Sequence, residues 1–383
     1  MNLVIRYSKL LIFIFVIYLM LAPTHFVESG MMRFFPTLVL MIVALCGLLS
    51  IRRGQKAKMG SIIFSFCIYI IFCSLIHSSY SDGPLTTFLK STYWCWMYFI
   101  SYTIFSYKEI KDCKYDKYVL IITILLFIVF NYNHYDRSKA ELLEGDNSIF
   151  YSLMFIPWVC CSKSTVKRWV MVLLITICAI VALKRSGIII ILSVLVLLYY
   201  RDFLRRNIMY PKNWIFGVVV ILCGILVYYK FPTSIVDVNQ RFNMIEDDGG
   251  NGREAIYKDV ISRYASADIS CQLFGNGFNS VAGTDKTRAL SAHNDFLEIL
   301  YDFGAIGLFF YILIHISLIK WSIRLFKQQS PMSFPVLISY ICFFVMSMVS
   351  HLVLYPTYFG LLTSFWAFAE CKDRQLRYEY QYQ

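Results

Sequence analysis

Long apolar runs recur along the whole chain, separated by shorter polar stretches. The runs are apolar on all sides rather than alternating with period two, so they predict helices and not the strands of a membrane barrel. A helix needs about 20 predominantly apolar residues to cross a bilayer, and these runs approach that length. The pattern therefore predicts an all-α polytopic membrane protein with about twelve transmembrane helices. The predicted spans are 9–23, 34–51, 60–77, 86–106, 117–131, 147–162, 168–183, 186–200, 213–230, 303–319, 334–350 and 356–370.

Composition agrees with this pattern. The chain has 383 residues, of which 58% are hydrophobic and only 16% charged. Ordinary soluble domains are about 45–50% apolar and about 25% charged, so a water-soluble fold is excluded. Residues 1–22 resemble a secretory signal, but no small-residue cleavage site follows them and Pro23 comes next. We interpret this stretch as a retained first span.

The net charge of +12 raises the question of a nucleic-acid partner. Membrane proteins, however, acquire positive charge through the excess of Lys and Arg in their cytoplasmic loops. When both termini are placed in the cytoplasm, every inner segment of the twelve-span topology is basic. The topology accounts for most of the net charge, and no nucleic acid is required.

One outer connection, residues 231–302, is far longer than any other and too long to be a simple connector. Its residues 253–264 and 295–301 can form helices, and the glycines of "FGNGF" suit a tight turn. We expect a small cap on the outer membrane face. The predicted domains are N-terminal spans at 1–230, the cap at 231–302, and C-terminal spans with a cytoplasmic tail at 303–383.

Of the 36 basic residues, 13 fall on the outer side, where positive charge is disfavoured, and three of these are candidates for a site. Lys184 and Arg185 occupy a short connection between two spans, and Arg253 lies in the long outer connection. The structural interpretation is snorkelling of Lys184 and Arg185 toward lipid headgroups, and local pairing of Arg253 with Glu254 or Glu246. The functional interpretation is an anion site at the membrane surface, because the planar guanidinium fork suits phosphate.

A polar stretch, "SAHNDFLEILYDFGAIGL" at 291–308, directly precedes a predicted span. Asp295 and Glu298 have the D-x-x-E form of a helix start, so His293 would lie just ahead of a helix N-terminus. The helix dipole there favours the neutral imidazole, whereas a nearby acid would favour the charged form. His293 is thus a candidate proton acceptor, with a hydrogen-bonded loop histidine as the alternative. Asn294 is expected to be an ordinary capping residue.

Two glycines in the same stretch, Gly304 and Gly307, are assigned no chemistry. They are expected to let a short helix turn into the following span, or to permit close helix packing.

Cysteine and histidine spacing predicts neither a disulfide nor a metal site. Cys271 is the single cysteine of the long outer connection, so a partner for it is missing. No two histidines are three or four residues apart, as paired ligands on a helix usually are.

Four segments together resemble the bacterial O-antigen polymerase and ligase superfamily: "LKRSG" at 183–187, "GREAIY" at 252–257, "LFGNGFNSV" at 273–281 and "AHNDFLEILYDFGAIGL" at 292–308. The histidine-asparagine segment with its following glycines is the most specific of them. Lys184 stands where a serine is usual in that family, and Tyr257 stands where a tryptophan is usual.

The resemblance implies a metal-independent, cofactor-free glycosyltransferase with a GT-C-like helical fold at the outer, periplasmic face of the bacterial inner membrane. It implies that His293 activates the acceptor hydroxyl and that Arg185 and Arg253 bind the undecaprenyl pyrophosphate of the donor. Lys184, Arg241, Asn294 and Tyr257 are candidate supporting residues. Donor and acceptor are lipid-linked glycans within membrane lipid, and a chain-length regulator and a flippase are candidate protein partners.

Three functions remain open at this point. An O-antigen polymerase joins lipid-linked repeat units, and it is favoured because similarity outside the motifs is low, as suits an enzyme tuned to one repeat unit. An O-antigen ligase would instead deliver finished glycan to lipid A-core. A polysaccharide flippase or transporter belongs to a different class, but charges near the middle of the spans and internal repeats are not evident.

Overall fold

The part of the chain that the structure describes is helical throughout and contains no strand, so the predicted all-α class is confirmed. The computed structural model describes residues 58–76, 84–107, 112–139, 147–182, 184–204, 253–283 and 291–381. The predicted spans 9–23, 34–51 and 213–230 and the candidate residue Arg241 lie outside these ranges.

The elements are α3 (Lys58–Ile76), α4 (Pro84–Tyr107), α5 (Asp112–Lys139), α6 (Ile149–Cys160), α7 (Thr165–Val181), α8 (Arg185–Tyr199), the π-helical turn η2 (Tyr200–Leu204), α11 (Arg253–Ser266), α12 (Ile269–Phe274), α13 (Ser280–Gly283), α14 (Asp295–Lys327), α15 (Ser333–Val349) and α16 (Pro356–Gln381).

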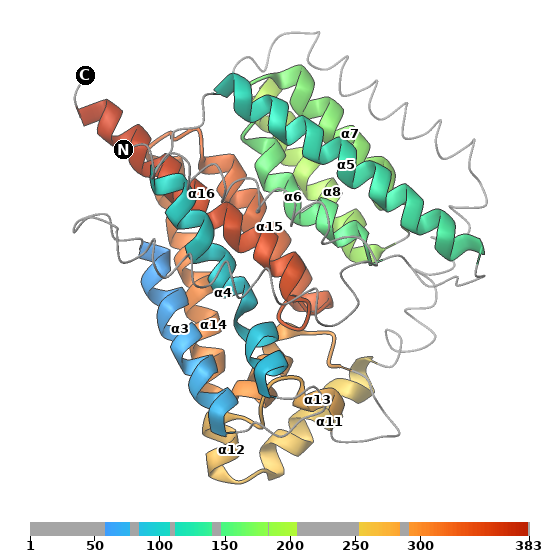
Figure 1. Cartoon of the computed structure of the whole chain (residues 1–383), viewed down its shortest axis with the longest axis vertical. Helices are drawn as coiled ribbons and strands as arrows, with labels where there is room; N and C mark the ends of the chain where they lie inside the picture. The colour runs from blue at the N-terminus through green and yellow to red at the C-terminus, as the bar shows by residue number, and fades with distance from the viewer. Residues whose placement is uncertain are drawn as a thin grey trace.

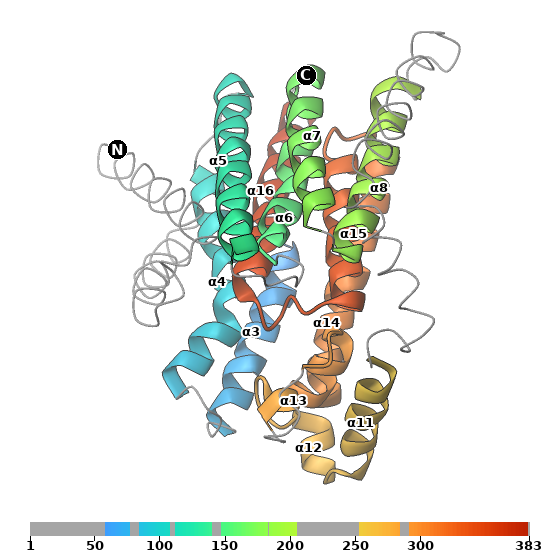
Figure 2. The same ribbon diagram turned by 90° about the vertical axis from the view of Figure 1, so that its right-hand side faces the viewer.

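The long helices run side by side, and the short helices α11, α12 and α13 gather at one end of the bundle (Figures 1 and 2). α16 packs along α4, while α14 lies between α3 and α15. α15 also contacts α6 and α8. It therefore connects the helices α3, α4, α14 and α16 to the helices α5–α8. The first residues of α14 lie at the same end as α11–α13, and its last residues lie at the opposite end.

The outer surface of the bundle is apolar, as expected for contact with lipid. Large exposed side chains include Leu75 on α3, Tyr132 on α5, Val166 on α7 and Val196 on α8, each at least two-thirds exposed. Four helical segments, Met59–Ile76, Lys114–Tyr135, Ser186–Phe203 and Asp295–Lys327, are long and apolar enough to cross a membrane. A polytopic membrane protein is consistent with these features, while the count of twelve spans stays a prediction.

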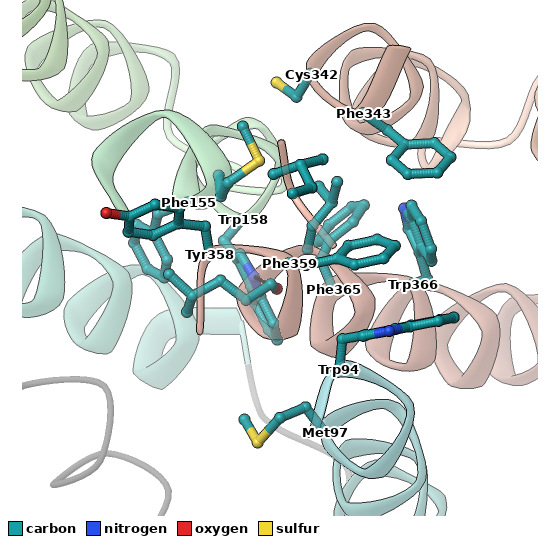
Figure 3. Packing of buried hydrophobic residues seen from close by; sticks show 14 of the residues in the cluster. Trp94, Met97, Phe155, Trp158, Cys342, Phe343, Tyr358, Phe359, Phe365 and Trp366 are labelled. Carbon is teal, nitrogen blue, oxygen red and sulfur yellow. Dashed lines mark hydrogen bonds between the residues drawn. The ribbon is translucent and has the colours of Figure 1, made fainter. Parts of the chain in front are cut away.

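Aromatic side chains fill the centre of the bundle (Figure 3). The indole of Trp94 on α4 stacks on Phe359 of α16 with a centroid distance of 4.5 Å. Phe343 on α15 packs against Phe359 at 5.4 Å and against Trp366 at 5.1 Å. These four side chains are fully buried, so α4, α15 and α16 share one core.

A backbone kink at Gly304 divides α14 into a short first segment and a long second segment. The kink leaves helix carbonyls without their usual partners, and groups from elsewhere satisfy them. Asn276 N–H donates to Tyr301 O at 3.0 Å, and Gly277 N–H donates to Asp302 O at 2.9 Å. The predicted turn of the chain at Gly304 and the predicted tight turn in "FGNGF" are therefore confirmed, and each supports the other.

The observed helices extend beyond several predicted spans. The span predicted at 303–319 is part of α14, which runs from Asp295 to Lys327. The span predicted at 356–370 continues in α16 to Gln381, and that predicted at 117–131 continues in α5 to Lys139. A helix satisfies its own backbone hydrogen bonds, so it need not end where its side chains become polar. The domain boundary at 302/303 falls inside α14, and the domain division stays a prediction.

Candidate active site

His293 lies immediately before α14 in a left-handed backbone conformation, with φ of 51°. Such a conformation is unfavourable for a residue with a Cβ and persists where the surroundings fix it. The next residue, Asn294, is extended and caps α14 by accepting from Phe296 N–H at 2.9 Å and Leu297 N–H at 3.3 Å. Its Nδ2 donates to Met348 O of α15 at 3.4 Å. Asn294 thus has the predicted capping role, and it fixes the backbone beside His293.

The first two acids of the polar stretch are buried structural anchors rather than a capping pair. Asp295 accepts hydrogen bonds from Tyr311 Oη at 2.9 Å, Leu352 N–H at 3.1 Å and Val353 N–H at 3.2 Å. Glu298 accepts from Ala292 N–H, two residues before the cap. The predicted helix start is confirmed, because α14 begins at Asp295 and His293 lies just ahead of it, but the N-cap is Asn294 rather than Asp295.

The third acid, Asp302, attaches the short helix α13 to α14. Its carboxylate accepts from Asn279 N–H at 2.6 Å, Ser280 N–H at 3.0 Å and Ser280 Oγ at 2.8 Å. Asp302 is buried, so these bonds replace the water that the charge has lost. Asp302 therefore attaches the cap to α14 through α13, and Asp295 attaches the connection that follows α15.

His351, in the connection between α15 and α16, is a site residue that the motif analysis did not identify. Its ring lies 4.6 Å from that of His293, centroid to centroid, with the planes tilted by 31°. Ser291 Oγ lies 3.0 Å from His351 Nδ1, and Tyr355 stacks on the other side at 4.9 Å. The sequence gives only a weak signal for this residue. The predicted spans place His351 in a short connection at the same membrane surface as His293.

Arg253 and Lys184 complete a positively charged surrounding for the two histidines. Burial lowers the pKa of His293, and the charges of Arg253 and Lys184 lower it further. Burial lowers the pKa of His351 to about 3, with contributions from His293, Arg253 and Lys184. Both imidazoles are therefore neutral at neutral pH. The sequence left open whether the helix dipole or a nearby acid prevails at His293. The pKa is lowered, as the dipole would predict, but the causes are burial first and then Arg253 and Lys184.

The helix that carries Arg253 is fixed in place by a small apolar cluster. Val260 of α11 packs with Val281, Ala292 and Tyr301, all buried. On the same helix Arg263 lies over the Tyr301 ring at 5.0 Å. Arg253 begins α11, and the predicted local partner Glu254 forms its ion pair with Lys258 at 2.6 Å. Local pairing of Arg253 with Glu246 falls outside the described residues, so the role of Arg253 stays a prediction.

The remaining predicted residues are placed in part. Lys184 is the residue before α8 and is partly buried, and Arg185 is the first residue of α8, so the predicted short connection between two helices is confirmed. Tyr257 lies on α11 one turn after Arg253 and is partly buried. The side chain of Arg185 lies outside the described residues, as do Arg241 and Glu246.

This arrangement can accept a proton and hold an anion. A neutral imidazole beside fixed cations can take a proton from a hydroxyl group, while the cations stabilise negative charge that develops nearby. Both functions require a site that is partly shielded from water, and His293 is partly buried.

Comparison with known proteins agrees with the sequence motifs. A protein-family model described as O-antigen ligase matches residues 170–312. The match begins within α7, covers α8, α11, α12 and α13, and ends within α14. It includes Lys184, Arg253 and His293, whereas His351 lies beyond it. No curated protein matches the chain. Residues 170–312 are therefore similar to the family described as O-antigen ligase, and the predicted resemblance to the O-antigen polymerase and ligase superfamily is confirmed.

Proposed function

We propose that this protein is a surface-polysaccharide polymerase that joins lipid-linked oligosaccharide repeat units. The observation that carries the proposal is the neutral His293 beside Arg253 and Lys184, within the segment that matches the O-antigen ligase family. A sugar hydroxyl is a poor nucleophile, and a lipid pyrophosphate is a strongly anionic leaving group. The site offers one group suited to each.

The donor in this proposal is a glycan linked to undecaprenyl pyrophosphate. Arg253 and Arg185 bind the pyrophosphate, and Lys184 adds positive charge beside them. As the bond between the anomeric carbon and the pyrophosphate oxygen breaks, negative charge gathers on that oxygen. Guanidinium groups held by α11 and α8 stabilise this charge without having to reorganise.

His293 acts as general base on the acceptor hydroxyl. The hydroxyl oxygen attacks the anomeric carbon from the side opposite the leaving pyrophosphate, and its proton passes to the imidazole. The new glycosidic bond then has the inverted configuration. A positioned base of this kind contributes about 10²–10⁴-fold to the rate.

We place the site at the periplasmic face of the inner membrane, with both termini in the cytoplasm. The excess of basic residues in the predicted inner loops supports this orientation. The lipid-facing apolar surface supports a multi-pass arrangement, in which α11–α13 cover the outer ends of the helices. A chain-length regulator and a flippase stay predicted partners.

A ligase is the second candidate, because the matching family model is described as O-antigen ligase. Polymerase and ligase use the same kind of donor and differ only in the acceptor. The site residues described above fit both reactions. A flippase is less favoured, since it would not need a proton acceptor beside an anion site.

A deletion strain distinguishes the candidates. We expect that loss of the gene abolishes the ladder of surface lipopolysaccharide on a gel and leaves a single repeat unit on the lipid A-core, and that the wild-type gene restores the ladder. Long glycan stranded on the lipid carrier, with none on the core, would instead identify a ligase. An unchanged ladder would contradict both assignments to lipopolysaccharide.

Replacement of Arg253 by alanine is expected to slow chain extension about 10²-fold, because one fixed positive group at the leaving pyrophosphate is removed. The measurement is the build-up of unextended lipid-linked repeat units in membranes at matched protein levels. Lys258→Ala is the matched control, since Lys258 lies on the same helix, its side chain is 76% exposed, and its ion pair among the described residues is with the exposed Glu254. Equal activity of the two variants would remove Arg253 from the donor site.

A further inference from the structure

A cavity of about 750 Å³ lies at the end of the bundle opposite His293. Its walls are the turn between α6 and α7, the π-helical turn η2, the connection between α14 and α15, and the C-terminal half of α16. The volume falls within the range of about 300–1,000 Å³ that is usual for ligand sites. The proposed polymerase reaction makes no use of this cavity.

The charge around the cavity is strongly positive. The charged residues that line it are Lys163, Arg168, Arg201, Asp202 and Lys372, so four basic side chains stand against one carboxylate. That carboxylate is already neutralised, because Asp202 accepts from Arg168 at 2.7 Å and from Arg201 at 2.8 Å. One carboxylate offsets only one of these two guanidinium charges, so positive charge remains at Arg201 and Lys372 for an anion.

One guanidinium group in the wall has unused hydrogen-bonding capacity. Arg201 donates its Nε to Asp202 and its Nη1 to Cys160 O at 2.9 Å, whereas its Nη2 is buried and has no acceptor among the described residues. A buried donor without a partner is destabilising, which favours binding of an acceptor. General enrichment of basic residues on one side of a membrane does not require them to converge on one cavity.

The rest of the wall is part polar and part apolar, and its polar residues include Ser162, Thr165, Gln329, Ser330, Ser333 and Gln375. Phe105, Phe334, Phe368 and Leu376 line the cavity together with the basic residues. The cavity lies at the ends of two helical segments that are long and apolar enough to cross a membrane, Ser186–Phe203 and Asp295–Lys327, so in a bilayer it would adjoin the headgroup region. A ligand with an anionic head and an apolar body matches such a wall.

We infer that this cavity binds a phosphate group, with the Arg201 guanidinium and the Lys372 ammonium as ligands. The same chemistry can come from the headgroup of an anionic phospholipid or from a soluble phosphate compound. Arginine binds phosphate through parallel hydrogen bonds, and lysine adds a point charge. The inference does not depend on the proposed polymerase reaction.

The test uses the full chain purified in detergent, with Arg253→Ala as the common background so that the site at His293 is weakened as an anion binder. Native mass spectrometry measures binding of phosphatidylglycerol, with phosphatidylcholine for comparison, and calorimetric titration measures binding of inorganic phosphate. Lys372→Gln and Arg201→Gln are the test variants. Lys167→Gln is the matched control, because Lys167 is an exposed lysine at the same end of the bundle that does not line the cavity.

We expect Lys372→Gln and Arg201→Gln each to weaken binding about tenfold and Lys167→Gln to leave it unchanged. Weakened binding of phosphatidylglycerol alone would identify a lipid headgroup, and weakened binding of inorganic phosphate would identify a soluble ligand. The inference is overturned if neither probe binds, if phosphatidylcholine binds equally well, or if all three variants behave alike. Lys372→Gln keeps the test valid should Arg201→Gln fail to fold, since Lys372 is partly exposed.

Discussion

Replacement of His293 by asparagine is expected to lower the rate of glycan extension about 10²–10⁴-fold while the protein still folds and inserts. The loss follows because the proposed base is removed, and a general base contributes a factor of this size. The neighbouring His351 is a much weaker base, since burial lowers its pKa to about 3. Asparagine is chosen because it tolerates the left-handed conformation that His293 adopts, whereas alanine would add backbone strain. His293→Ala is expected to lose at least as much activity.

The measurement is extension of lipid-linked repeat units by purified enzyme in proteoliposomes, over a range of pH. The wild-type rate should rise with pH through an apparent pKa below the ordinary histidine value of about 6.5, because burial, Arg253 and Lys184 all lower the pKa of His293. The base is active only when neutral, so activity is lost as the pH falls through that value. Normal product from His293→Asn, or an unchanged acid limb in that variant, would remove the assignment of His293 as the base.

The helices could be predicted from the sequence because a membrane permits few alternatives. A lipid-exposed backbone has to satisfy its own hydrogen bonds, so each long apolar run within the described residues becomes a helix. The ends were less predictable. α5 continues to Lys139, beyond the predicted span, because the apolar pattern marks only the part of a helix that contacts lipid. It does not mark where the helix ends in water. α14 joins a predicted cap helix to a predicted span, because hydrogen bonds from the turn at Asn276 and Gly277 support its kink.

The candidate site was predictable only where its signals are local in the sequence. His293 and Asn294 stand together in one motif, and the capping role of Asn294 follows from its residue type and position. His351 reaches the site through contacts between distant segments: Ser291 Oγ lies 3.0 Å from its Nδ1, and Asp295 accepts hydrogen bonds from Leu352 and Val353, more than fifty residues further along the chain. Contacts between segments so far apart depend on the folded bundle and leave no spacing pattern.

The backbone contact between the turn after α12 and the kink of α14 should tolerate no side chain. A Cβ built on Gly304 would lie 2.3 Å from Leu273 O, and one built on Gly275 would lie 2.2 Å from Asp302 O. Both glycines also have positive φ, 68° and 82° respectively, which L residues rarely adopt. These neighbours are backbone atoms that cannot rotate away, so the two segments would have to separate.

Gly304→Ala is therefore expected to destabilise the protein by roughly 3 kcal/mol or more, combining backbone strain with steric overlap. Gly187→Ala is the matched control, because a Cβ at that position on α8 would meet only Leu153 Cδ1 at 3.4 Å and other atoms at ordinary contact distance. Alanine also favours a helix over glycine by about 1 kcal/mol, so Gly187→Ala should be neutral or stabilising. The measurement is the midpoint of thermal unfolding in detergent, followed by tryptophan fluorescence.

Loss of the contact between the turn after α12 and the kink of α14 would also disturb the candidate active site at His293. The turn after α12 holds the cap on α14, and α11 of that cap carries Arg253, so separation of the two segments would displace Arg253 from His293. At temperatures where Gly304→Ala is still folded, we expect its activity to fall toward that of Arg253→Ala. A wild-type unfolding midpoint in Gly304→Ala would show that the turn and the kink do not touch as described. A lowered midpoint with full activity would show that the contact stabilises the fold without positioning Arg253.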